Sequence, residues 1–168
     1  MMKRILMIAV AMLPLMLMAQ ARIGIVNSQN IFELMPEKAA AEAQLKAMSE
    51  KYHAEYELLR GEFDKKYADY QTVAADASTP ETIKERRVQE LQESDKKMRE
   101  FERKAADDLA ARRTALTQPI TDKIQAAIRA AGEQGGFDLV FDTAVTPVAY
   151  IGPNTVDITP MVKSILGL

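Results

Sequence analysis

The sequence predicts a mostly α-helical α+β protein, in which a long antiparallel helical hairpin forms an arm that projects from a small β body. The middle of the chain is rich in charge and nearly free of Pro and Gly, with 16 Lys+Arg and 18 Asp+Glu between Glu37 and Arg113. Short apolar, β-branched segments typical of strands occur only near the two ends. The body is therefore expected to be assembled from both ends of the chain.

The first 21 residues have the layout of a secretory signal peptide. Lys3 and Arg4 precede an uncharged apolar run over residues 5–18, and Ala19-Gln20-Ala21 has the small-x-small pattern of a signal peptidase site. An uncleaved membrane anchor is the alternative, but the apolar run is shorter than the roughly 20 residues that span a bilayer. We expect export and cleavage after Ala21.

Composition excludes several kinds of function. Cleavage after Ala21 leaves 20 Lys+Arg against 24 Asp+Glu, an acidic balance that argues against nucleic acid as a partner. The chain has no Cys, which excludes thiolate metal sites and thiol nucleophiles, and its one His, His53, is expected on the surface. No Gly-rich phosphate loop is present. We expect no enzyme, no bound metal and no cofactor.

The arm is predicted over residues 37–117. A short strand over 22–27 and a short helix that runs into Pro36 come before it, and the first long helix is expected over 37–77. Ser78-Thr79-Pro80-Glu81 has the capping residues and the first-turn Pro of a new helix, which is predicted to continue to about Thr117. Two helices of matched length around a short break indicate an antiparallel hairpin.

An apolar stripe one residue wide follows each predicted arm helix. In the first helix its members are spaced by three or four residues in an eleven-residue repeat, which favours a nearly straight pair of helices. Much of this stripe is aromatic, and such side chains serve either as hairpin core or as a partly exposed surface for apolar client segments. The client-contact candidates are Tyr52, Tyr56, Phe63, Tyr67 and Tyr70.

The body is predicted from residues 22–36 and 118–168. Pro119 is expected to kink or restart the returning helix, and strands are expected over 137–142 and 147–151. Thr159 is expected to cap a last short helix with Pro160 in its first turn. About 65 residues make a small core without metal or disulfides, so oligomerisation through strand edges is expected.

The two ends of the chain resemble the Skp/OmpH-like periplasmic chaperones. Arg22-Ile-Gly-Ile-Val-Asn-Ser-Gln-Asn-Ile-Phe32 is similar to the opening strand and helix of that family. Phe137-Asp-Leu-Val-Phe-Asp142, Val148-Ala-Tyr150 and Val156-Asp-Ile-Thr159 are similar to its closing segment. The charged hairpin has a length that the family shows, although charged hairpins are common.

The resemblance implies an ATP-independent holdase of the periplasm. It implies a homotrimer, in which strands of three subunits form a small barrel and three arms enclose a cavity for unfolded outer-membrane β-barrel proteins. An alternative from another class is a structural or adaptor coiled-coil protein of the cell envelope without chaperone activity. The two hypotheses differ in what the chain binds: a holdase prefers unfolded barrel proteins, whereas an adaptor binds one folded partner.

The resemblance also suggests a lipopolysaccharide or membrane-surface site, with one departure. The best-known members are basic, whereas this arm is slightly acidic, so long-range attraction of acidic ligands is expected to be weaker. Ordinary solvated charges are the alternative interpretation of the basic residues. The lipopolysaccharide-binding candidates are Lys104, Arg112, Arg113 and Lys123.

Overall fold

The computed structural model describes residues 21–168, so that the predicted signal peptide, apart from Ala21, lies outside the described residues. The protein is mostly helical with a small β-sheet, which confirms the predicted fold class. In chain order the elements are β1 (Ile23–Val26), α2 (Ser28–Leu34), α3 (Pro36–Ala75), α4 (Glu81–Gly135), β2 (Leu139–Asp142), β3 (Val156–Asp157) and α5 (Thr159–Leu166).

The chain divides into two compact units. One consists of the two ends of the chain, up to Ile31 and from Ile124 onward, and the other runs from Phe32 to Lys123. The divisions fall inside α2 and α4, so neither coincides with the end of an element.

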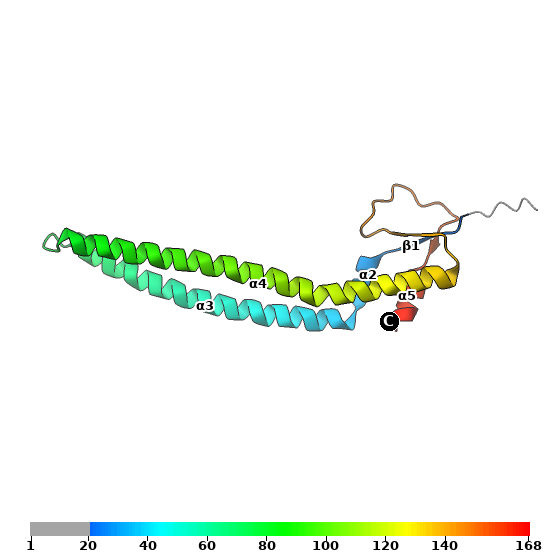
Figure 1. Ribbon diagram of the computed structural model, residues 1–168, viewed down its shortest axis with the longest axis horizontal. Coiled ribbons are helices and arrows are strands. Elements are labelled where there is room, and N and C mark those ends of the chain that lie inside the picture. Colours follow the sequence, from blue (N-terminus) through cyan, green and yellow to red (C-terminus); the bar gives the residue numbers. More distant parts are fainter. Residues whose placement is uncertain (1–20) are drawn as a thin grey trace, which may run out of the picture. The chain divides into compact units, whose positions relative to one another are not determined.

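In the unit from Phe32 to Lys123, α3 and α4 form a long helical hairpin and lie side by side (Figure 1). The turn between them is organised by Asp76, whose carboxylate accepts hydrogen bonds from the Ser78 backbone N–H at 2.8 Å and from the hydroxyls of Ser78 and Thr79. The predicted Ser/Thr cap was therefore wrong in its details, because these hydroxyls donate to Asp76 rather than cap α4. A short carboxylate commonly closes a turn in this way.

Pro119 does not interrupt α4, which continues without a break to Gly135. Of the two predicted outcomes, a restart of the helix was wrong, and a kink at Pro119 stays a prediction. A proline removes one backbone donor, but its neighbours keep helical geometry. Ile120 is almost completely buried, and the hydroxyl of Thr121 donates to the carbonyl of Thr117 at 3.2 Å. The burial of Ile120 and the hydrogen bond of Thr121 stabilise the helix on the C-terminal side of Pro119.

The other unit contains a three-stranded parallel sheet in the order β2-β1-β3. β1 is central, with Ile23 opposite Leu139 and Gly24 opposite Val156. Gly24 lies in a crowded position, since a Cβ there would be 3.2 Å from the Ile158 side chain and the neighbouring side chains would have to shift by a few tenths of an ångström. Parallel strands need long crossover connections. The hairpin supplies the one between β1 and β2.

The core of this unit is formed by fully or nearly fully buried aliphatic residues: Val26, Ile31, Ile124, Ala127, Ala131, Ile158 and Val162. α4 ends with Gly136 in the left-handed conformation at φ +61°, and the Phe137 N–H donates back to the Gly132 carbonyl at 3.0 Å. The predicted strand over 147–151 was wrong, because that segment is irregular and Val156–Asp157 forms the third strand instead. α5 begins at Thr159, with no side-chain cap.

Candidate functional site

The hairpin has a core only one stripe wide. Along α3, Leu59 is buried, at 6% exposure, while most of the other inward residues are half-buried. On α4, Ala105 is buried and Leu109 is half-buried. Two helices that share one stripe leave most of their surface in water. Because the hairpin is so thin, a surface that binds a partner lies close to the residues that hold the two helices together.

Tyr52 is half-buried and joins both helices. Its ring meets Phe101 edge to face with centroids 5.9 Å apart, and its hydroxyl donates to the Asp108 carboxylate at 3.0 Å. The hydrogen bond to Asp108 is the main cause that raises the pKa of Tyr52. An aromatic ring with a polar tip suits this boundary between core and water. Tyr52 thus contributes mainly to hairpin packing.

The other aromatic candidates differ in their exposure. Partial burial, with Glu102 nearby, raises the pKa of Tyr56. Phe63 and Tyr67 stack along α3 with an interplanar angle of 9° and centroids 6.3 Å apart, and Tyr67 is 47% exposed. Tyr70 lines a separate groove of about 750 Å³ near the turn. Tyr67 is the most accessible of the five side chains.

Two features of the hairpin surface involve neighbouring residues in different environments, and the second was not predicted from the sequence. Leu58 is 65% exposed, directly beside buried Leu59. Lys66, rather than Tyr67, faces the opposite helix, and its ammonium group donates to the hydroxyl of Ser94 at 2.5 Å. Ser94 is only 8% exposed. The signal in the sequence was Ser94 itself, a polar residue in line with the apolar stripe of α4.

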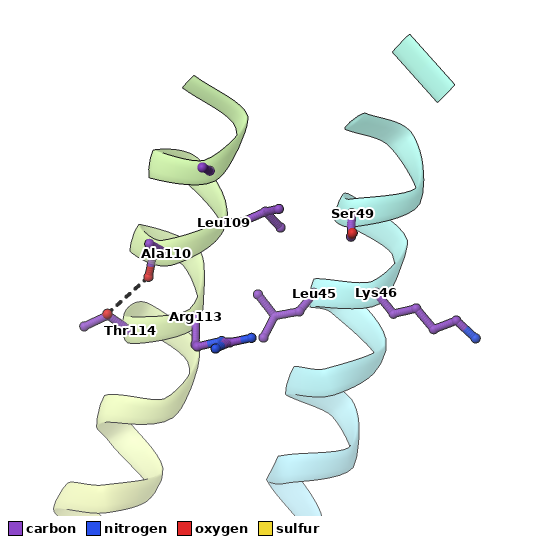
Figure 2. Close-up of a pocket in the computed structure, with 8 residues that line it drawn as sticks. Leu45, Lys46, Ser49, Leu109, Ala110, Arg113 and Thr114 are labelled. Carbon is purple, nitrogen blue, oxygen red and sulfur yellow. Dashed lines mark hydrogen bonds between the residues drawn. The ribbon is translucent and has the colours of Figure 1, made fainter. Parts of the chain in front are cut away.

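A groove of about 590 Å³ lies between α3 and α4, where several of the lining residues have small side chains. Figure 2 shows Leu45 and Leu109 pointing toward one another across it, with Arg113 extending from α4 toward Leu45. Lys46 points away from the groove (Figure 2). The Thr114 hydroxyl donates to the Ala110 carbonyl at 3.2 Å, so it adds little free hydrogen-bonding capacity. The groove offers an apolar floor with one cation at its rim.

The four lipopolysaccharide candidates are not gathered into one cluster. Lys104 and Lys123 are 19 positions apart on one helix, which corresponds to about 28 Å along its axis. The Lys123 ammonium lies 2.7 Å from the Glu37 carboxylate, and this hydrogen bond lowers the pKa of Glu37. The Arg112 guanidinium donates to the Gln44 side chain at 2.7 Å. Lys104 and Arg113 are exposed.

The sheet-containing unit exposes several large apolar side chains. Tyr150 and Val145 are 80% and 75% exposed, and both lie in the irregular segment between β2 and β3. Leu139 on β2 and Val156 on β3 are also exposed. Within the described part of the chain, β2 and β3 each have only β1 as a neighbour. Such apolar surface beside free strand edges is typical of an interface.

Residues 21–168 contain no group of three or more His, Asp or Glu side chains placed to hold a metal ion. In the same residues, no helix combines the length and apolar character needed to cross a bilayer. His53 is exposed on α3.

Residues 22–166 match the family model described as outer membrane protein (OmpH-like). The chain belongs to this OmpH-like family. The match covers both units, so it includes the sheet as well as the hairpin. The resemblance inferred from the two ends of the sequence is thereby confirmed. The OmpH-like family is a family of chaperone type rather than an enzymatic one, and it is associated with the periplasm and the outer membrane. No curated protein matches the chain.

Proposed function

We propose that this OmpH-like protein is an ATP-independent periplasmic holdase. In this proposal it is exported with cleavage after Ala21 and binds unfolded outer-membrane β-barrel proteins in a cavity between the arms of a homotrimer. The arm comprises residues 37–117, and the trimerisation body comprises residues 22–36 and 118–168. Binding without a chemical step prevents aggregation until the client is released.

The observation that carries the proposal is the exposure of apolar groups on a highly charged hairpin with a thin core. Leu58 and Tyr67 are accessible on α3, and a groove with Leu45 and Leu109 lies between the helices. An unfolded barrel protein offers apolar segments, and each contact removes apolar surface from water, at about 25 cal/mol per Å². Several small contacts hold a client reversibly, while the surrounding charges keep the complex soluble.

Free strand edges and exposed apolar residues support the homotrimer. The segment 147–151 is apolar and β-branched, yet it pairs with no strand in the described chain. Its Tyr150 is largely exposed, as is Val145 nearby. Pairing of this segment with a strand of another subunit would cover both side chains and satisfy its backbone groups. The body then gains in the oligomer the core that it is too small to provide alone.

The test of holdase activity is dilution of a urea-unfolded outer-membrane barrel into buffer with the mature protein and no nucleotide. Suppressed light scattering is expected, with weaker suppression by Tyr67→Ala. Tyr52→Phe is the matched control, because the Tyr52 ring packs on Phe101 within the hairpin. A protein that leaves aggregation unchanged but retains one folded envelope partner in a pull-down would instead be the structural or adaptor protein.

Lipopolysaccharide is a second proposed ligand. Lys104 and Arg113 are exposed and are the candidates best placed to reach phosphate groups, while Lys123 and Arg112 already contact side chains on α3. The expected result is salt-sensitive binding of lipopolysaccharide vesicles that Arg113→Ala weakens more than Lys123→Ala does. Equal binding by both variants and the unaltered chain would exclude this site.

A further inference from the structure

The sheet-containing unit holds the backbone nitrogen of Arg22 at a carboxylate. This nitrogen lies 2.7 Å from Oδ2 of Asp138, and the Asp138 N–H donates to the Arg22 carbonyl at 3.0 Å. The two bonds close the end of the ladder just before the first β1–β2 pair, Ile23 opposite Leu139. Asp138 thus fixes the residue at which the ordered strand begins.

The Arg22 side chain is held separately from its backbone. Its guanidinium donates to the Gly135 carbonyl and lies over the Phe137 ring, 4.6 Å from the centroid. The guanidinium is therefore engaged at the end of α4, whereas the Asp138 carboxylate accepts a hydrogen bond from the Arg22 backbone N–H. Backbone and side chain together fix the position of this nitrogen.

We infer that Asp138 is the binding site for the new α-ammonium group that cleavage after Ala21 creates at Arg22. This inference rests on the export step of the proposed function. In the uncleaved chain the nitrogen belongs to a neutral peptide group and donates one hydrogen bond to the carboxylate. Hydrolysis of the Ala21–Arg22 bond adds water across it, and the released amine becomes an ammonium at neutral pH.

An ammonium at the same place forms a charge-assisted hydrogen bond with Asp138, which is stronger than the neutral one. Removal of the signal peptide thereby strengthens the β1–β2 ladder at its first residue. Cleavage at another bond would place the charge away from Asp138. The charge-assisted contact is therefore specific to a mature chain that begins at Arg22, and it couples processing to the stability of the sheet.

The experiment is a cycle of four chains at one fixed protein concentration, since oligomerisation makes the melting temperature depend on concentration. The chains begin at Arg22 or at Gln20, each with Asp138 or with Asp138→Asn. Exposed ion pairs change a folding equilibrium about twofold to fivefold. The chain that begins at Arg22 should melt about 2 °C above the longer one when Asp138 is present, and the difference should vanish with Asp138→Asn.

Asp142→Asn is the matched control. Its carboxylate, on the last residue of β2, accepts hydrogen bonds from the N–H groups of Ser28 and Ala144. This variant should lower the melting temperature of both chain lengths equally and preserve their difference. Equal effects of chain length with Asp138 and with Asn at position 138 would overturn the inference.

Two further measurements decide the matter if Asp138→Asn does not fold. Acetylation of the amino group of Arg22 should reduce the melting temperature to that of the longer chain, and 1 M NaCl should shrink the advantage of the free amine. The intact mass of the exported protein should correspond to Arg22 as its first residue, and any other start would overturn the inference. None of these assays contains a client, so loss of holdase activity would leave their outcome unaffected.

Discussion

Leu58 and Leu59 are neighbours on α3 with opposite environments, and they separate hairpin stability from client binding. Leu59 is 6% exposed between the helices, whereas Leu58 is 65% exposed. We predict that Leu59→Ala destabilises the hairpin with a smaller direct effect on client contact. Leu58→Ala should leave the hairpin intact and weaken client binding.

The magnitude follows from the side-chain atoms removed. Leu→Ala deletes three carbon groups, and at about 0.8 kcal/mol for each buried one the transfer cost is about 2.4 kcal/mol. A two-helix hairpin can collapse around the vacancy, so the cavity contribution is small and the total is about 2–3 kcal/mol, at the lower end of measured values. For exposed Leu58 the expected cost is about 0.5 kcal/mol or less.

Hydrogen exchange of the α3 and α4 amides measures this difference within the hairpin itself. A loss of 2–3 kcal/mol corresponds to exchange about 30- to 150-fold faster in Leu59→Ala, against less than about threefold in Leu58→Ala. Suppression of barrel aggregation, measured at a temperature where both variants are folded, should decline more in Leu58→Ala. Equal exchange rates in the two variants would refute the packing argument, and full client protection by Leu58→Ala would refute the assigned contact.

Three further predictions concern two glycines, the turn around Asp76, and the hydrogen bond between Lys66 and Ser94. Gly61→Ala should raise the free energy of unfolding by about 1 kcal/mol because the site is helical with open space around it. Gly136→Ala should lower it by about 1–2 kcal/mol because φ is +61°. Urea titration measures the free energy of unfolding of both variants. Changes of the same sign would contradict the different backbone conformations assigned to Gly61 and Gly136. Hydrogen bonds from Ser78 and Thr79 lower the pKa of Asp76 below 3.8. These hydrogen bonds therefore stabilise the folded protein above pH 3.8, and this stabilisation is lost as the pH falls through the lowered pKa that Asp76 has in the folded protein. Asp76→Ala should make the urea midpoint less dependent on pH in this range. Ser94→Ala alone should lower the midpoint because the Lys66 ammonium loses its partner, whereas Lys66→Leu with Ser94→Ala should restore or raise it. A double variant less stable than the single one would contradict this role of the pair.

The hairpin could be predicted because its signals are local. A long stretch with almost no Pro or Gly, followed by Ser78-Thr79-Pro80, indicates two helices wherever they pack. The choice between Lys66 and Tyr67 as the inward residue could not be made in this way. Spacings of three and four residues both fit one helix face, and a Lys stem can cover apolar surface. The partner across the hairpin, Ser94, decides the matter.

The third strand was misplaced for a tertiary reason. Residues 147–151 have the composition of a strand, but composition alone does not decide which segment pairs with β1. β1 already has β2 on one side and Val156–Asp157 on the other. In contrast, spacings of three and four residues along the first helix include Leu59 in the apolar stripe and leave Leu58 outside it, in agreement with their exposures. The Arg22–Asp138 contact joins residues 116 positions apart and left no local signal.

The most direct test of the central claim is the mass of the native particle, measured with and without a urea-unfolded outer-membrane barrel and without nucleotide. The proposal predicts three mature chains alone, and three mature chains with one unfolded barrel when the client is present. A monomer that forms no complex with the unfolded barrel would contradict it.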